Sequence, residues 1–285
     1  MVCTTKKLIN LLAMISVILV LSSCTAGGGG DGVIHDGRGI AVSAKPPLAR
    51  IVSTAPNLTT IMVSIGQGQC LAGISDLCPQ PDPARPLPRI GSLIGPDAER
   101  ISALSPDCVI ASYEGNPPQM ADTMRALKIP FYVARIDSLA SLEKTMLDLE
   151  LLACGTNSEA LRTSISNLRS AIIGRLAGKR IFFQIGTTTE AWTFGRNTLV
   201  HDALVLAGAS NLGSGRPGNF PRFDAETMAS LNPDIVVFLT GHNKQRDEAF
   251  WKRYAPRSRL LTPDPALFEQ PGPRIAEGIR ALAQP

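Results

Sequence analysis

A thirteen-residue segment occurs twice in this chain, and this repeat constrains the fold more than any other feature. Residues 97–109 (DAERISALSPDCV) and 224–236 (DAETMASLNPDIV) are identical at seven of thirteen positions. In each copy an Asp and a Glu open a short helix, where carboxylates suit the exposed N–H groups. The helix ends at Leu-x-Pro-Asp, because proline cannot continue it, and the apolar run that follows is typical of a buried parallel strand. The repeat therefore predicts two related lobes.

The remaining pattern extends each repeat into an α/β lobe. Residues 50–57 (RIVSTAPN) and 180–187 (RIFFQIGT) are both basic, then apolar, then rich in turn residues, so each is predicted to begin a lobe. Short strands and helices alternate after them, which is typical of parallel sheets with right-handed crossovers. Residues 141–178 instead have leucines at helical spacing and predict two consecutive helices, broken at 155–158. The predicted fold is therefore α/β, with two Rossmann-like lobes at 49–140 and 179–285 joined by a helical linker, 141–178.

The N-terminus has the pattern of a bacterial lipoprotein signal. Within residues 1–23 two lysines precede an apolar run, and Leu-Ser-Ser-Cys then ends at Cys24. About 14 apolar residues are too few to span a bilayer. We expect Cys24 to be acylated and to anchor the protein to a membrane, in the periplasm or at the cell surface; the alternative is a cleaved signal without a lipid. Residues 24–48 are rich in glycine and small polar residues and predict a flexible tether.

Charge and motifs exclude several function classes. Removal of residues 1–23 lowers the net charge from 28 − 24 = +4 to 26 − 24 = +2, and no basic run points to nucleic acid. The chain has no phosphate-binding glycine loop and no nucleophile elbow, and its two lobes contain only His201 and His242, so we expect no enzyme. The chain contains no Cys-x-x-Cys motif, so the sequence gives no indication of a zinc site. Four cysteines follow Cys24, and their spacing does not determine whether they pair: Cys70, Cys78, Cys108 and Cys154.

The lipoprotein signal, the two α/β lobes and the paired E-x-x-x-x-L-x-P-D-x-V motifs resemble the helical-backbone class of ABC-transporter substrate-binding proteins over about residues 48–285. Within that class the chain is most similar to the vitamin B12-binding family, on the segments STAPNLT, GISDLCPQP and FEQPGPRI. The resemblance implies capture of cobalamin for a permease dimer with its ATPase subunits. Cobalamin is then a transported ligand and not a resident cofactor. Haem and siderophore binders share much of the pattern, so an iron siderophore or haem is the alternative ligand.

Candidate ligand-binding residues lie in the loops that follow the strands. Ligands of open parallel sheets bind beyond the carboxyl ends of the strands, and two facing lobes create one cleft lined by loops from both. Aromatic residues make up only 5% of the chain, yet several fall in these loops, where they would contact a large macrocycle. Phe194 is expected instead to cover the core of its own lobe, and His242 is also a candidate axial ligand of a haem. The predicted ligand-binding residues are Pro56, Asn57, Asp76, Cys78, Tyr113, Trp192, Phe220, His242 and Phe268.

The duplicated glutamates form a second candidate site. In the family that the chain resembles, the residues matching Glu99 and Glu226 lie on the outer rims of the lobes and engage arginines of the two permease subunits. Complementary charge at two points sets docking orientation, although isolated exposed ion pairs contribute little. The other interpretation is that both acids begin helices. Docking is the preferred interpretation, because Asp97 and Asp224 are available for the helix ends.

Overall fold

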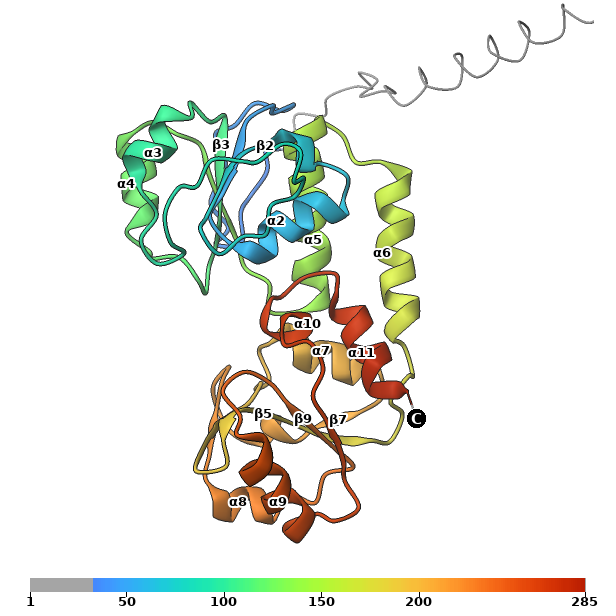
Figure 1. Ribbon diagram of the computed structural model, residues 1–285. Coiled ribbons are helices and arrows are strands. Elements are labelled where there is room, and N and C mark those ends of the chain that lie inside the picture. Colours follow the sequence, from blue (N-terminus) through green and yellow to red (C-terminus); the bar gives the residue numbers. More distant parts are fainter. Residues whose placement is uncertain (1–32, 285) are drawn as a thin grey trace, which may run out of the picture.

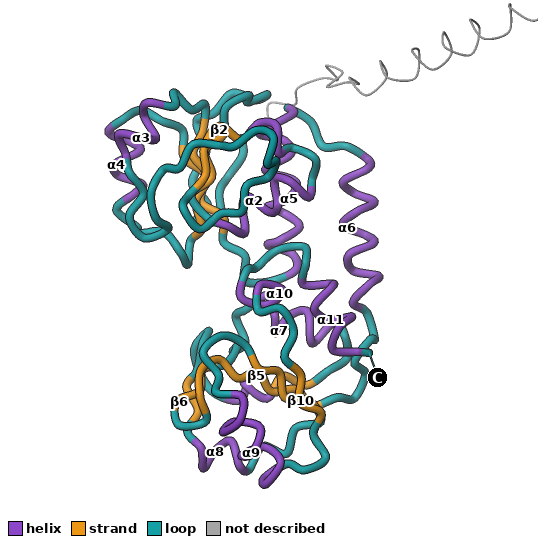
Figure 2. Tube along the Cα trace, in the orientation of Figure 1, coloured by secondary structure: helices purple, strands orange, loops and turns teal. Residues whose placement is uncertain are grey.

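The structure, a computed structural model, describes residues 33–284 and consists of two α/β lobes joined by helices (Figure 1, Figure 2). The predicted fold class is confirmed. The signal segment and Cys24 lie outside the described residues. In the first lobe a four-stranded sheet has the order β2-β1-β3-β4, and every pairing is parallel. Its strands are β1 (Ile51–Ser53), β2 (Leu71–Ile74), β3 (Cys108–Ser112) and β4 (Phe131–Ala134).

Alternation along these strands sends side chains to two apolar layers. Ile51 and Ile110 face the larger cluster, which includes residues of α2, whereas Val52 and Val109 face a smaller cluster beneath α3 and α4. Pro56 stands in the first turn of α2, where its missing N–H costs nothing. The helices of this lobe are α2 (Pro56–Ser64), the 3₁₀ turn Gly68–Cys70, α3 (Ala98–Ala103) and α4 (Met120–Ala126).

The second lobe differs from the prediction in having a mixed sheet. Strands β5 (Arg180–Thr187), β7 (Ser210–Asn211), β9 (Ile235–Phe238) and β10 (Arg259–Leu261) pair in parallel, as expected. Trp192, which was predicted to lie in a loop, instead belongs to β6 (Glu190–Trp192), which pairs antiparallel with β5 and with β8 (Arg222–Phe223). Gly186 permits this hairpin, because its φ is +85° and a Cβ there would lie 2.7 Å from the Glu190 carbonyl oxygen.

Five α-helices and a 3₁₀ turn accompany the strands of the second lobe within the described chain. They are α7 (Leu199–Leu206), the 3₁₀ turn Leu212–Gly215, α8 (Ala225–Ala229), α9 (Lys244–Tyr254), α10 (Ala266–Glu269) and α11 (Ile275–Ala283).

Two helices connect the lobes, and the break between them falls where the sequence predicts it. Helix α5 (Leu139–Cys154) ends at Gly155, which has a left-handed φ of 75°, and α6 (Glu159–Ile172) begins with Ser158 as its cap. The buried Glu150 carboxylate accepts hydrogen bonds from the Ser158 N–H (2.9 Å) and hydroxyl (2.7 Å). Helix α5 packs against α2 of the first lobe and α7 of the second, and α6 packs against α11 of the second lobe. Within residues 33–284, no helix combines the length and apolar character that crossing a membrane requires.

The two sequence repeats belong to one structural unit that occurs once in each lobe. In the first lobe, Arg50 Nη2 donates to the carbonyl oxygen of Leu104 (2.6 Å), and the Arg50 N–H donates to the Asp107 carboxylate (2.8 Å). The arginine thereby satisfies a carbonyl at the end of α3, and the aspartate fixes the start of β1. In the second lobe the same contacts measure 2.7 Å each and involve Arg180, Leu231 and Asp234. The repeated sequence therefore forms the same arginine and aspartate hydrogen bonds in both lobes.

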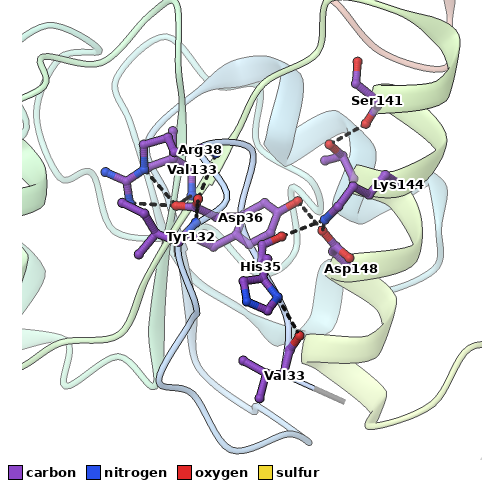
Figure 3. A network of polar contacts seen from close by, with 11 residues as sticks. Val33, His35, Asp36, Arg38, Tyr132, Val133, Ser141, Lys144 and Asp148 are labelled. Atoms are coloured by element: carbon purple, nitrogen blue, oxygen red, sulfur yellow. Dashed lines mark hydrogen bonds and ion pairs between the residues drawn. The ribbon is translucent and has the colours of Figure 1, made fainter.

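The prediction of a flexible tether over residues 24–48 is wrong for residues 33–48, the part of it that the structure describes. Residues 33–48 pack on the first lobe beside β4 and α5 (Figure 3). The buried Asp36 carboxylate accepts hydrogen bonds from backbone N–H groups including that of Val133 (3.3 Å), and it pairs with Arg38 (2.6 Å). The Gly37 N–H donates to the Val133 carbonyl (2.7 Å), and Lys144 Nζ reaches the His35 carbonyl (2.7 Å). The glycine-rich composition of the segment gave no indication of these contacts, because they are made with β4 and α5, which are far away in the sequence.

Replacing Asp36 with alanine is expected to lower the free energy of unfolding by about 2 kcal/mol or more, because it leaves buried N–H groups and Arg38 without their acceptor. The Asp36 side chain is fully shielded from solvent, whereas that of Arg38 is 22% exposed. Chemical unfolding followed by circular dichroism measures the change. The matched control is Asp82→Ala, an exposed aspartate whose carboxylate accepts a local bond from the Ala84 N–H, with an expected change within about 0.5 kcal/mol. Equal midpoints for both variants would contradict the role assigned to Asp36.

A candidate ligand cleft between the lobes

A cavity of about 510 Å³ lies between the two lobes, where the sequence predicts a cleft. Residues that follow β1, β3 and β4 line it from the first lobe, and residues at or beyond the ends of β5, β9 and β10 line it from the second. These positions are at carboxyl ends of strands, as expected for a ligand site on open parallel sheets, and Leu93 and residues between β6 and β8 complete the lining. Two bonds connect the lobes near this site: Asn57 Nδ2 donates to the Pro271 carbonyl (3.3 Å), and the Leu139 N–H donates to the Asp202 carboxylate (2.7 Å).

Four of the predicted ligand-binding residues line the cavity: Pro56, Asn57, Phe220 and Phe268. The Phe220 ring is 47% exposed, so it offers apolar surface to a ligand. Phe268 is only 3% exposed and packs edge-on against Phe183, with ring centroids 4.9 Å apart. Phe194 was expected in the core; it packs against Phe183 (5.3 Å) and also lines the cavity. These rings make one side of the cleft apolar and continuous with the core beneath it.

Two predicted aromatic residues do not line the cavity. Trp192 lies on β6, where Ala191 points into the core and the residues on either side of it point outward. Period-two alternation thus directs the indole away from the interior, and it is 43% exposed. Tyr113 is 50% exposed and lies against the Arg135 guanidinium, 5.1 Å from its ring centroid. Tyr113 follows β3 directly, as predicted, whereas Trp192 belongs to β6 and not to a loop, and the direction of neither side chain was available from the sequence.

Three predicted polar residues also lie away from the cavity lining. Asp76 and Cys78 lie in the long connection between β2 and α3, from which Leu93 lines the cavity but these two residues do not. Cys78 is buried, and its sulfur lies 3.2 Å from the Thr59 hydroxyl, so its thiol packs within the first lobe and does not line the cavity. His242 stacks on Phe238 (5.3 Å between centroids), and its Nδ1 donates to the Leu239 carbonyl (2.8 Å).

Three carboxylates that the sequence analysis missed line the cavity: Glu114, Asp137 and Glu269. Glu269 is held by the Thr240 N–H (3.0 Å) and hydroxyl (2.6 Å). Asp137 accepts from Arg135 Nε (2.9 Å). Partial burial raises the pKa of Glu114; its own backbone N–H opposes this rise, and the negative charge of Asp137 adds to it. Glu114 and Asp137 come within three residues of the ends of β3 and β4, so the rule about strand ends, applied to acids as well as aromatics, would have found them.

The lining has a distinct chemical character. It contains apolar, hydroxyl, amide and carboxylate side chains, and none of the lining residues is Lys, Arg, His, Cys, Tyr or Met. Within residues 33–284, no cluster of three or more His, Cys, Asp or Glu side chains is arranged to hold a metal ion. The cleft is therefore suited to a large ligand that presents apolar surface and hydrogen-bond donors.

The repeated acids lie elsewhere, on α3 and α8, on the sides of the two lobes away from α6 (Figure 1). The Asp97 carboxylate caps α3 by accepting from the Glu99 N–H (3.0 Å), and Asp224 caps α8 by accepting from the Thr227 N–H (2.8 Å). The Thr227 hydrogen bonds lower the pKa of the Asp224 carboxyl. Both caps are thus supplied by the aspartates, and the exposed side chains of Glu99 and Glu226 are not the caps.

Comparisons with known proteins agree with this architecture. Residues 51–255 match the periplasmic binding protein family. The vitamin B12-binding protein of Yersinia pestis (strain Pestoides F) is 29% identical over 252 residues, which cover 82% of this chain and 85% of that protein.

Two solved structures have the same fold. The vitamin B12-binding protein of Vibrio cholerae has a TM-score of 0.67 at 20% identity, over 83% of this chain and 96% of its own. A periplasmic haem-binding protein of Pseudomonas aeruginosa has a TM-score of 0.65 at 23% identity, over 83% and 91%. The matched proteins are substrate-binding proteins and not enzymes. With the family match extending over both lobes, the chain belongs to the periplasmic binding protein family.

Proposed function

We propose that this protein is the substrate-binding lipoprotein of an ABC importer, which captures cobalamin in the interlobe cleft and delivers it to a permease dimer with its ATPase subunits. The similarity to a vitamin B12-binding protein along most of both chains supports this ligand. The observation that favours cobalamin over haem as the ligand is the composition of the cleft lining.

The lining fits a corrinoid better than a haem. A haem carries two carboxylates and needs an axial ligand such as His, Tyr, Cys or Met. The lining has no cation to pair with the carboxylates and none of those ligands, and His242 is held against Phe238. Cobalamin brings its own lower ligand to cobalt and has amides on its rim, which carboxylates can accept. The acidic and apolar cleft thus matches a neutral, amide-rich macrocycle.

A direct binding experiment tests the proposal. Residues 25–285 are titrated with cyanocobalamin, haemin and a ferric siderophore, and binding is followed by absorption spectroscopy and native mass spectrometry. We expect a one-to-one complex with cyanocobalamin and no stoichiometric complex with the other two. A haem or siderophore complex without cyanocobalamin binding would reassign the protein to the alternative ligand. Haem is a specific alternative because one protein with the same fold is a haem-binding protein.

The anchoring part of the proposal concerns Cys24, at the end of the Leu-Ser-Ser-Cys segment. Cys24→Ala is expected to abolish acylation and to release the protein from membranes into the soluble fraction, because one thiol carries the whole anchor. Metabolic labelling with a fatty-acid analogue and membrane fractionation measure this. Cys70→Ala, a change at a cysteine within the first lobe, is the matched control and is expected to leave labelling intact. Lipid labelling that persists in Cys24→Ala would place the anchor elsewhere.

A further inference from the structure

We propose that the cleft recognises the amide groups on the rim of its ligand by hydrogen bonding, and that it binds corrinoids more weakly when a carboxylic acid replaces such an amide. Glu114 is the residue that discriminates between the two groups. This inference rests on the proposed function, because it concerns the same cleft and takes a corrinoid as ligand. It adds a chemical criterion that similarity to vitamin B12-binding proteins does not supply.

The three cleft carboxylates differ in how far protein donors satisfy them. Thr240 donates twice to Glu269, and Arg135 and Ser141 donate to Asp137. Glu114 receives no hydrogen bond from another residue in the described chain; its own backbone N–H is the donor it has. Its side chain lines the cavity and is partly exposed, so it is the acceptor with unused capacity.

The charges around Glu114 favour a donor and disfavour a second carboxylate. Asp137 adds negative charge on the same side of the cleft, and Glu269 lines it from the second lobe. Arg135 is the nearby cation, but it is paired with Asp137 and lies against the Tyr113 ring. A ligand amide would donate to Glu114 in a charge-assisted hydrogen bond. A ligand carboxylate at the same place would meet like charge with no cation in the lining to offset it.

The test compares cyanocobalamin with monocarboxylic acids made from it by hydrolysing one peripheral propionamide. Calorimetry at pH 7.5 is expected to show that the wild type prefers cyanocobalamin over at least one such acid by about tenfold or more. Glu114→Gln removes the charge at nearly constant shape and is expected to reduce that preference to about threefold or less. The matched control, Glu159→Gln, changes an exposed glutamate on α6 outside the cleft and is expected to retain the full preference.

A pH series separates charge from shape. The Glu114 carboxylate accepts a charge-assisted hydrogen bond only when ionised, so cyanocobalamin affinity is fully present above its pKa and falls as the pH is lowered through it. Because that pKa is raised, the fall begins at a higher pH than the ordinary value of 4.5 would give. Asp137, Glu269 and Arg135 are the other charged groups facing this part of the cleft, and the fall should be absent in Glu114→Gln if Glu114 is its source.

The outcomes distinguish this inference from the proposed function. No cyanocobalamin binding by the wild type would overturn both. Tight cyanocobalamin binding with equal affinity for every acid, or a preference that Glu114→Gln retains in full, would leave the proposed function standing and overturn the role of Glu114.

Discussion

Changing Glu99 and Glu226 together to arginine is expected to abolish delivery of ligand to the permease while leaving ligand affinity in solution intact. The two exposed side chains stand on α3 and α8, outside the residues that line the cleft, and Asp97 and Asp224 already cap these helices. Reversing both charges would set like charge against the arginines that we propose as partners. Calorimetry with cyanocobalamin and uptake into vesicles that contain the reconstituted importer measure the two properties.

Single changes are expected to reduce uptake less, because the other lobe keeps its contact. The matched control is the double variant Glu159→Arg and Glu277→Arg, which makes the same change of net charge on α6 and α11. Normal uptake by the Glu99 and Glu226 double variant would mean that both acids serve only their own helices. Lost ligand affinity would mean instead that they act on the cleft.

Replacing Phe220 with alanine is expected to weaken cyanocobalamin binding by about 1 to 3 kcal/mol, or about 5- to 150-fold, because the exposed part of its ring is buried only when ligand is present. Nearly half of the ring surface is exposed in the cleft, where it tilts against Phe194 at 6.0 Å between centroids. The loss of apolar contact falls on the complex and not on the folded protein, so the unfolding midpoint should barely change. Calorimetry and thermal unfolding measure both quantities.

Trp192→Ala is the matched control for this change. Trp192 is an aromatic residue of the same lobe, is similarly exposed at 43%, and lies outside the cavity lining. Its truncation should leave cyanocobalamin affinity within about twofold of the wild type. If Trp192→Ala weakened binding as much as Phe220→Ala did, the ligand would extend beyond the cavity onto β6.

Local sequence signals predicted the elements because those signals act over a few residues. The Leu-x-Pro-Asp endings place the ends of α3 and α8, since proline removes a helix donor wherever the chain goes next. Gly155 ends α5 in a left-handed conformation for the same local reason. The segment 33–48 shows the limit of such signals: its composition is that of a linker, but Asp36 and Gly37 find partners on β4, almost 100 residues away.

The site was predictable only in outline for a related reason. Strand ends indicate which loops can reach a ligand, and this identified Asn57, Phe220 and Phe268. It also included Asp76, because the sequence does not say which residues of the long connection after β2 reach the cavity; Leu93 does and Asp76 does not. Glu114 was overlooked, although it stands two residues beyond the end of β3, where the same rule about strand ends applies to acids.

By itself, the sequence determined that the chain folds into two related α/β lobes with a helical connection, because the repeat and the strand and helix periodicities are encoded in neighbouring residues. Only the tertiary structure decided which side chains meet in the cleft. Trp192 and Phe220 were equivalent as sequence, and the direction of β6 turned one outward while the loop before β8 brought the other to the cavity. That choice depends on strand pairing and on how the two lobes face each other, which are contacts between residues far apart in the chain.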